Sequence, residues 1–170
     1  MRLYVMRHAD AVPRGTPGYG PDAERPLTPE GRLQARGVAK GLKRLEVPIK
    51  MIVTSPYVRA VQTSEEVRRV FGAGIEIATM DELRAEANPE EASLALRSFS
   101  AYDHVLAVGH EPHCSAWIAE LVADSGGMRC LMKKSGLACV GLERIPPPRG
   151  SGTLRWLMAS KHLGLIGKAP

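Results

Sequence analysis

Short apolar segments alternate along the chain with longer segments in which apolar residues recur every three or four positions. The short segments have the length of buried strands, and the longer ones have the spacing of amphipathic helices. Strands are expected at residues 3–6, 50–54, 75–79, 104–108, 137–145 and 153–158. Helices are expected from residue 29, from about 56 to 71, from 89 to 99, and after Pro112, where positions 114, 117, 118, 121 and 122 are apolar.

The alternation of these strands and helices is typical of a largely parallel sheet that helices cover on both faces. The last two strands flank a turn rich in Pro and Gly at residues 146–150, so they are expected to form an antiparallel hairpin at one side of the sheet. The length of 170 residues is enough for one domain. We therefore predict a three-layer α/β/α sandwich, a single domain over residues 1–170, with a mostly parallel central sheet and an antiparallel C-terminal edge.

Polar residues and prolines mark where two of the helices begin. Thr28 is placed to cap the first helix, and Pro29 suits its first position. Ser55 and Pro56 repeat this signal, so Ser55 is predicted to be a helix cap rather than a catalytic hydroxyl. Residues 9–27 are rich in Gly and Pro and are read as a loop, of a length that often serves as a functional lid.

Composition narrows the classes of function. The net charge is +5, but Lys and Arg are scattered and only 5% of residues are aromatic, which favours an anionic substrate over nucleic acid. No segment has the ~18 apolar residues of a membrane span and no signal peptide is recognisable, so a cytoplasmic protein without a membrane partner is expected. The three cysteines form no C-x-x-C pair, which argues against a zinc site, and Cys114 is expected in the core.

Three of the predicted strands end in residues with related chemistry. Arg7 and His8 end the first strand, Arg59 lies one helical turn beyond the second, and His110 follows the fourth. Because ligands of parallel sheets bind beyond the carboxyl ends of the strands, these side chains should meet. Arginine binds phosphate in a bidentate manner, and histidine can act as nucleophile, general acid or phosphate ligand. The set predicts a phosphoryl pocket without metal or other cofactor.

The same segments resemble those of the histidine phosphatase superfamily, the relatives of the phosphoglycerate mutases. Four motifs are similar in particular to the SixA-type phosphohistidine phosphatases, in the same order and at compatible spacing over nearly the whole chain. They are MRHADA at residues 6–11, RPLT at 25–28, SPYVRAVQT at 55–63 and GHEP at 109–112.

The resemblance implies a role for each matching residue. His8 is the expected nucleophile, which forms a covalent phosphohistidine, and its second ring nitrogen is best held by a backbone carbonyl. Arg7 and Arg59 are expected to clamp the phosphoryl oxygens, and His110 to donate a hydrogen bond to them. Arg25 of the long loop either contacts the phosphate or only fixes the loop.

The proton donor is the point where the chain departs from the family pattern. Mutases and many phosphomonoesterases of the superfamily carry a glutamate in a Leu-Arg-Glu-like segment after the third strand, where this chain has Ala85. Glu86, one residue later, and Asp10 are the remaining candidates. The departure disfavours ester hydrolysis and fits cleavage of a phosphoramidate, whose imidazole leaving group needs less help from an acid.

The expected function is therefore hydrolysis of phosphohistidine on a protein, such as a histidine phosphotransfer domain in signal transduction, through phospho-His8. A small-molecule phosphomonoesterase is the alternative within enzymes, and a mutase comes third. A phosphate-binding module without catalysis is a different class, which the joint presence of both arginines and both histidines argues against. A monomer is expected, with phosphate or sulfate able to occupy the pocket.

Overall fold

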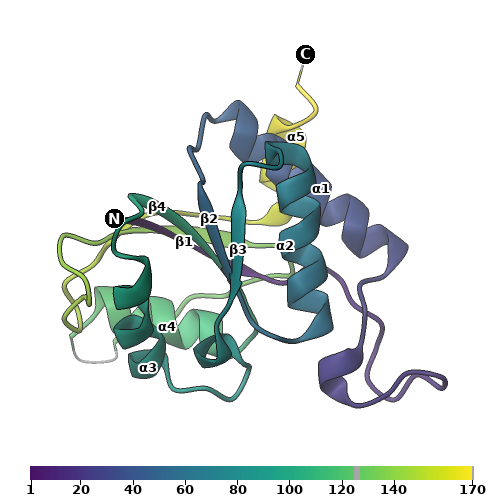
Figure 1. The fold of residues 1–170 in the computed structure, drawn as a ribbon, viewed down its shortest axis with the longest axis horizontal. Coiled ribbons are helices and arrows are strands. Elements are labelled where there is room, and N and C mark those ends of the chain that lie inside the picture. Colours follow the sequence, from purple (N-terminus) through teal and green to yellow (C-terminus); the bar gives the residue numbers. More distant parts are fainter. Residues whose placement is uncertain (125–126, 170) are drawn as a thin grey trace.

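The structure, a computed structural model, describes residues 1–124 and 127–169. Its six strands form one sheet in the order β3-β2-β4-β1-β5-β6 (Figure 1). The first four strands are parallel, β5 is antiparallel to β1, and β6 is antiparallel to β5. The strands are β1 (Arg2–Arg7), β2 (Met51–Thr54), β3 (Glu76–Thr79), β4 (His104–Gly109), β5 (Leu137–Gly141) and β6 (Thr153–Met158).

Helices cover both faces of this sheet (Figure 1). They are α1 (Pro29–Arg44), α2 (Val58–Phe71), α3 (Pro89–Ala95), α4 (His113–Val122) and α5 (Ser160–Ile166), with short 3₁₀ turns η1 (Asp22–Glu24), η2 (Asp81–Leu83) and η3 (Leu96–Phe99). Tyr4 and Met6 of β1 pack with apolar residues of α1, α2 and α5, whereas Leu3 and Val5 pack with α3 and α4. Burial on both faces explains why this strand is an uninterrupted apolar segment, and the α/β fold predicted from the sequence is confirmed.

Two local predictions were wrong, and one helix was missed. The strand expected to reach residue 145 ends at Gly141, and helix α2 begins at Val58, with Tyr57 rather than Ser55 at its N-cap. The Ser55 hydroxyl lies 2.8 Å from Nε2 of His110 and accepts a longer hydrogen bond, at 3.4 Å, from the amide of Tyr57, which precedes the helix. Helix α5 was not predicted, since its single fully buried residue, Leu163, gives no helical pattern until it packs against α1.

The loop at residues 9–27 is held back against the body of the protein. Ala11 forms a β-bridge with Leu27, and the Val12 amide donates to the carbonyl of Pro26 at 2.9 Å. Between these contacts the loop contains the turn η1, which lies against α2. The loop thereby carries Asp22 to the side chain of Arg59.

Two further predictions concern burial and the membrane. Cys114 lies in the core, 1% exposed, as expected, and all three cysteines are free thiols. Within the described residues, no helix has both the length and the apolar character needed to cross a membrane.

Candidate functional site

Three neighbouring strands deliver the candidate residues to one edge of the sheet. Strand β4 lies between β1 and β2, and all three run in the same direction. Beyond their ends the His8 amide donates to Gly109 and the Ser55 amide donates to Val108, both at 2.9 Å. The rings of His8 and His110 come to lie with their centroids 5.0 Å apart. The juxtaposition of the two histidines therefore follows directly from the strand order.

The ring of His8 is fixed in one tautomer. Its Nδ1 lies 2.7 Å from the carbonyl oxygen of Ala9, and a carbonyl can only accept, so Nδ1 carries the proton. The lone pair is left on Nε2, where it accepts a hydrogen bond from Nε of Arg59 at 3.2 Å. The nitrogen with the free electron pair thus faces the arginine that could bind a phosphoryl group.

The same ring is held neutral. Burial is the main reason why the pKa of His8 is lowered to about 3, with only 7% of the residue exposed. The hydrogen bond to Ala9 raises this pKa, while the positive charges of Arg59 and Arg7 lower it. At neutral pH the imidazole is therefore uncharged, as a nitrogen nucleophile must be.

Arg59 is buried and forms part of an ion-pair cluster that sequence reasoning missed. Its guanidinium binds the Asp22 carboxylate at 2.9 Å and also donates to the Asp22 carbonyl. Arg25 binds the same carboxylate at 2.7 Å and Arg14 at 2.6 Å. Arg25 also donates to the carbonyl of Val12. One carboxylate therefore gathers three guanidinium groups beside His8.

The Asp22 carboxylate is ionised throughout this arrangement. Burial alone would raise its pKa, but hydrogen bonds from Arg14 and Arg25 and the charge of Arg59 outweigh it and bring the pKa well below its ordinary value. The only feature of the sequence that could have indicated this cluster is the position of Asp22 three residues before Arg25. That spacing allows a local pair, but nothing in it indicates the contact with Arg59.

His110 faces His8 from the end of β4 and is 1% exposed. Its Nε2 lies 2.8 Å from the Ser55 hydroxyl, whereas its buried Nδ1 has no hydrogen-bond partner among the described residues. Burial, together with the nearby His8 and Arg59, lowers the pKa of His110 to about 2. The ring is therefore neutral in the unliganded site and has one nitrogen unused.

Arg7 lines the pocket and is anchored to a distant segment of the chain. One of its terminal nitrogens donates to the carbonyl of Met132 at 2.9 Å. Its Nε is buried and has no partner in the part of the chain that the structure describes. Arg7, like His110, thus offers a polar group that an oxyanion could satisfy.

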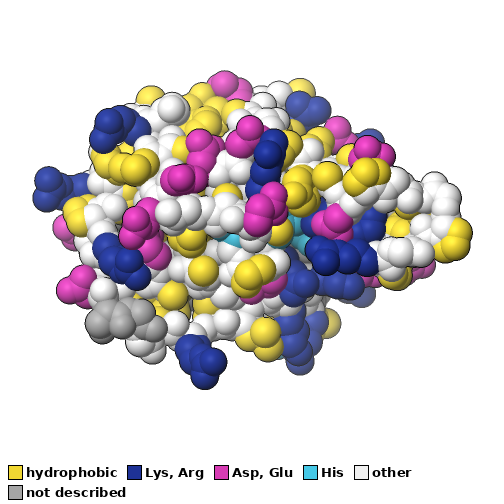
Figure 2. Space-filling view, turned by 90° about the horizontal axis from the view of Figure 1, so that it is seen from below, with side chains coloured by type: hydrophobic (Ala, Val, Ile, Leu, Met, Phe, Trp, Pro, Cys, Tyr) yellow, Lys and Arg dark blue, Asp and Glu magenta, His cyan; other side chains and the backbone are white. Residues whose placement is uncertain are grey.

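These residues surround a pocket of about 450 Å³ that opens on the molecular surface. Figure 2 shows histidine atoms at the bottom of a hollow, with Lys and Arg side chains gathered beside it. The lining residues include five cationic side chains and two carboxylates, which are Arg7, Arg14, Arg25, Arg59 and Lys134 against Asp10 and Glu111. The excess of positive charge suits an anionic ligand.

The structure separates the two proton-donor candidates named from the sequence. Asp10 lines the pocket, but its ion pair with Lys134 is the largest reason why its pKa is lowered, so it is ionised at neutral pH. Glu86 accepts a hydrogen bond from the Tyr57 hydroxyl at 2.8 Å and does not line the pocket, whereas Ala85 does. Glu111 was not considered from the sequence. It lines the pocket, and burial raises its pKa.

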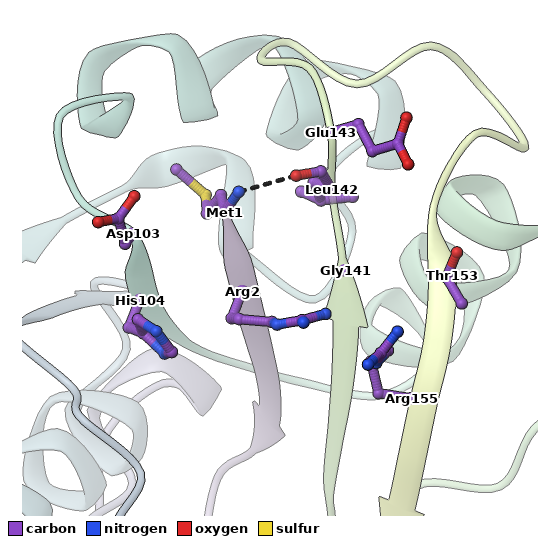
Figure 3. A pocket seen from close by; sticks show the side chains of 9 residues that line it. All are labelled: Met1, Arg2, Asp103, His104, Gly141, Leu142, Glu143, Thr153 and Arg155. Carbon is purple, nitrogen blue, oxygen red and sulfur yellow. Dashed lines mark hydrogen bonds between the residues drawn. The ribbon is translucent and has the colours of Figure 1, made fainter.

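The other histidines lie away from this pocket. His104 lines a separate cavity of about 400 Å³ at the opposite end of β1 and β4 (Figure 3). Its Nδ1 lies 3.0 Å from the Tyr4 hydroxyl. His113 is buried in helix α4, and His162 is exposed on α5. Among the described residues, no group of three or more His, Cys, Asp or Glu side chains is arranged to hold a metal ion.

Comparison with known proteins agrees with the motifs and with the strand order. The family model of the histidine phosphatase superfamily (branch 1) matches residues 3–88. The chain belongs to this superfamily. Phosphohistidine phosphatase SixA of Escherichia coli K12 is 30% identical over 165 residues, which are 96% of each chain. The resemblance inferred from the motifs is thereby confirmed, and the protein is a phosphatase of the histidine phosphatase superfamily.

Solved structures extend the similarity to the fold. The structure of the protein histidine phosphatase SixA complexed with tungstate has a TM-score of 0.82 and 30% identity, and covers 96% of this chain and 99% of that one. The alpha-ribazole phosphatase from Shigella flexneri has a TM-score of 0.73 at 18% identity, with 94% and 97% covered, which is a likeness of fold alone. Two phosphatases whose names give different activities thus share the fold of this chain.

Proposed function

We propose that this phosphatase hydrolyses phosphohistidine on a protein, through a covalent phosphohistidine at His8 and without a metal ion. The observation that carries the proposal is the state of the site around Nε2 of His8. A neutral ring carries a lone pair on Nε2 that only Arg59 contacts, and two buried nitrogens of residues that line the same pocket, Nδ1 of His110 and Nε of Arg7, have no hydrogen-bond partner among the described residues. A phosphoryl group supplies both the electrophile and the missing acceptors.

The first step is attack of Nε2 on phosphorus. A bond forms between Nε2 and phosphorus while the bond from phosphorus to the imidazole of the substrate breaks. Arg59 and Arg7 stabilise the negative charge on the phosphoryl oxygens, and a protonated Nδ1 of His110 donates to them. Arg59 Nε moves from the His8 lone pair to an oxygen of the incoming group, because the attacking nitrogen cannot keep that hydrogen bond.

In the second step water attacks the phosphorus of phospho-His8, the bond to Nε2 breaks, and inorganic phosphate leaves. The proton released from water goes to phosphate or solvent, and His8 returns to its neutral form. The hydrogen bond from Nδ1 to Ala9 keeps the same tautomer throughout both steps. Each turnover therefore consumes one water and returns the enzyme unchanged.

The leaving group explains why the missing glutamate is tolerated. When the second nitrogen of the substrate imidazole already carries a proton, cleavage of the phosphorus–nitrogen bond releases a neutral ring, and no carboxylic acid has to deliver a proton. Ester hydrolysis differs, because an alkoxide leaving group needs a proton. Ala85, which lines the pocket at the position expected for the glutamate, has no proton to donate.

A small-molecule phosphomonoesterase is the second candidate, and one observation favours it. Glu111 lines the pocket and has a pKa raised by burial, and the Ser115 hydroxyl donates to it at 2.9 Å. A carboxyl of this kind is more readily protonated near neutral pH than an exposed one. It could protonate an ester oxygen where the usual glutamate is absent.

Substrate comparison and trapping separate these candidates. Wild-type protein, treated with a chelator to remove metal ions, is incubated with a phosphohistidine protein and, separately, with sugar phosphates, and kcat/KM is compared. Label on the enzyme is then trapped by rapid quench and located. We expect a strong preference for phosphohistidine and acid-labile label on His8, and neither label nor turnover in the His8→Ala variant.

Each alternative has its own outcome in this experiment. A wide preference for sugar phosphates, lost in Glu111→Gln, would establish the phosphomonoesterase instead. Tight phosphate binding without turnover of any substrate would indicate a binding module. Full activity of His8→Ala would exclude the proposed covalent mechanism whatever the substrate.

A further inference from the structure

A broad groove lies between helices α1 and α5, outside the phosphoryl pocket. The two helices pack side by side (Figure 1), and the groove between their outer surfaces has a volume of about 1000 Å³. Between the helices Gly37 of α1 faces Gly164 of α5, where a β-carbon on Gly37 would lie 3.8 Å from the α-carbon of Gly164. A β-carbon on Gly164 would meet no atom within 4 Å, so the groove is open at this position.

The groove combines exposed apolar side chains with unpaired cations. Leu33 is 64% exposed and Leu165 is 66% exposed, the former on α1 and the latter on α5. Around them are Lys40, Lys161 and Lys168, none of which has an ion pair with another described residue. Glu30 is the only carboxylate among the lining residues. The chemistry that complements this surface is an acidic segment with an apolar residue at its centre.

The groove is joined to the phosphoryl pocket through Gln34. The side chain of Gln34 accepts a hydrogen bond from the amide of Asp10, which lines the pocket, and donates one to Ser160 of α5, both at 3.2 Å. Gln34 itself lines the groove. A protein bound with its phosphorylated side chain in the pocket also covers the groove if the rest of its surface lies over α1 near Gln34.

We propose that the α1–α5 groove docks an acidic surface, with a central apolar residue, of the phosphoprotein whose phosphohistidine enters the pocket at His8. This inference rests on the proposed function and deepens it by naming the chemistry of the partner. The lysines attract and orient the acidic surface, and the leucines supply the apolar contact. Substrates without that surface use only the pocket.

The test compares a large and a small substrate of the same chemistry. The probes are an acidic histidine phosphotransfer domain phosphorylated on its histidine and the free amino acid phosphohistidine. Lys40→Glu combined with Lys161→Glu, and separately Leu33→Ser, are expected to lower kcat/KM for the domain about tenfold and leave that for the free amino acid unchanged. The loss in the lysine variant should shrink as ionic strength rises.

Matched controls place the same changes elsewhere. Lys50→Glu reverses an exposed lysine outside both the groove and the pocket, and Leu94→Ser alters a leucine on α3 that is 57% exposed. Neither should affect either substrate. Equal losses for both substrates in the groove variants, or no loss in either, would overturn the docking proposal while leaving the phosphatase proposal intact.

A binding titration with the unphosphorylated domain requires no turnover, so it tests docking even if the protein hydrolyses neither probe. Weaker binding by the groove variants than by wild-type supports docking, and absence of binding by wild-type refutes it. Sedimentation of the wild-type protein and the Leu33→Ser variant tests whether a second copy of this chain, rather than the substrate protein, occupies the groove. If the substitution abolishes self-association instead, a second copy of the chain fills the groove and the proposal is wrong.

Discussion

Arg59 donates from Nε to Nε2 of His8 at 3.2 Å while its outer nitrogens are bound by Asp22. A single guanidinium thus contacts the proposed nucleophile on one side and a carboxylate on the other. The planar group can do so because its donors are fixed in a fork. In the proposed mechanism, the phosphoryl group of the substrate has to compete with Asp22 for Arg59.

Replacement of Arg59 by lysine tests this fork. A lysine ammonium can reach one partner but cannot span the carboxylate and the phosphoryl oxygens together, so we expect kcat with free phosphohistidine to fall about 10²–10³-fold. Arg69→Lys is the matched control on the same helix, where Arg69 is exposed and paired with Glu66. Wild-type kcat in Arg59→Lys would show that the guanidinium does not stabilise the transition state.

Asp22→Asn removes the carboxylate that binds Arg14, Arg25 and Arg59 and offsets part of their positive charge. With their charge released, inorganic phosphate should inhibit about tenfold more strongly, equivalent to about 1.4 kcal/mol in binding. At the same time kcat should fall, because Arg59 loses the partner that orients it. Both parameters are obtained from steady-state inhibition by phosphate.

The control for this variant is Asp81→Asn, which breaks the exposed pair between Asp81 and Arg84 outside the pocket. It should leave phosphate inhibition unchanged. If Asp22→Asn weakens phosphate inhibition instead, Asp22 holds the arginines in their binding positions rather than competing for them.

Three buried histidines should make the stability sensitive to acid. Burial lowers the pKa of His8 to about 3, of His110 to about 2 and of His113 to about 4. Below pH 6.5 the unfolded chain takes up protons that the folded one does not, so the free energy of unfolding falls as pH is lowered from 6.5 toward the folded pKa values. Each histidine contributes up to about 1.4 kcal/mol per pH unit.

Urea unfolding between pH 6.5 and 5 measures this slope above the range where ordinary carboxylates titrate. His8→Asn and His113→Asn should each make the slope shallower. His162→Asn, at an exposed position, should leave it unchanged. An identical slope in all three variants would mean that the buried rings are protonated in the folded protein.

The sequence predicted the strands well because β1, β2 and β4 are buried on both faces and therefore uniformly apolar. Their carboxyl ends located His8, Arg59 and His110, since parallel strands direct all such ends to one edge. Helix α5 escaped prediction for the opposite reason. Its position depends on Leu163 packing into α1 beside Gly41, a contact between segments more than a hundred residues apart.

Local sequence patterns also could not predict the side-chain contacts of the site. Asp22 lies in a segment rich in Gly and Pro, and its contact with Arg59 requires the loop to fold back onto α2. Ser55 precedes a proline as a helix cap often does, but the helix begins at Val58 and the Ser55 hydroxyl pairs with His110, a residue 55 positions away in the sequence. Periodicity identifies elements, whereas side-chain pairing between elements depends on how they are packed.

A close approach of two backbones links α1 to the site. A β-carbon on Gly31 would collide with the carbonyl oxygen of Asp10, two residues beyond His8. Alanine normally favours a helix over glycine by about 1 kcal/mol. We nevertheless expect Gly31→Ala to lower the free energy of unfolding by about 1–3 kcal/mol and to reduce kcat, because the backbone must shift beside the proposed nucleophile, His8.

Gly37→Ala is the matched control in the same helix, where the nearest atom to the added carbon is 3.8 Å away. Without a collision, the helix preference of alanine should leave stability unchanged or raise it by up to about 1 kcal/mol, with kcat on free phosphohistidine unaffected. Chemical denaturation and steady-state kinetics on both variants check the pair. Equal stability of Gly31→Ala and Gly37→Ala would show that the loop after His8 yields without cost, and that contact with α1 does not set its position.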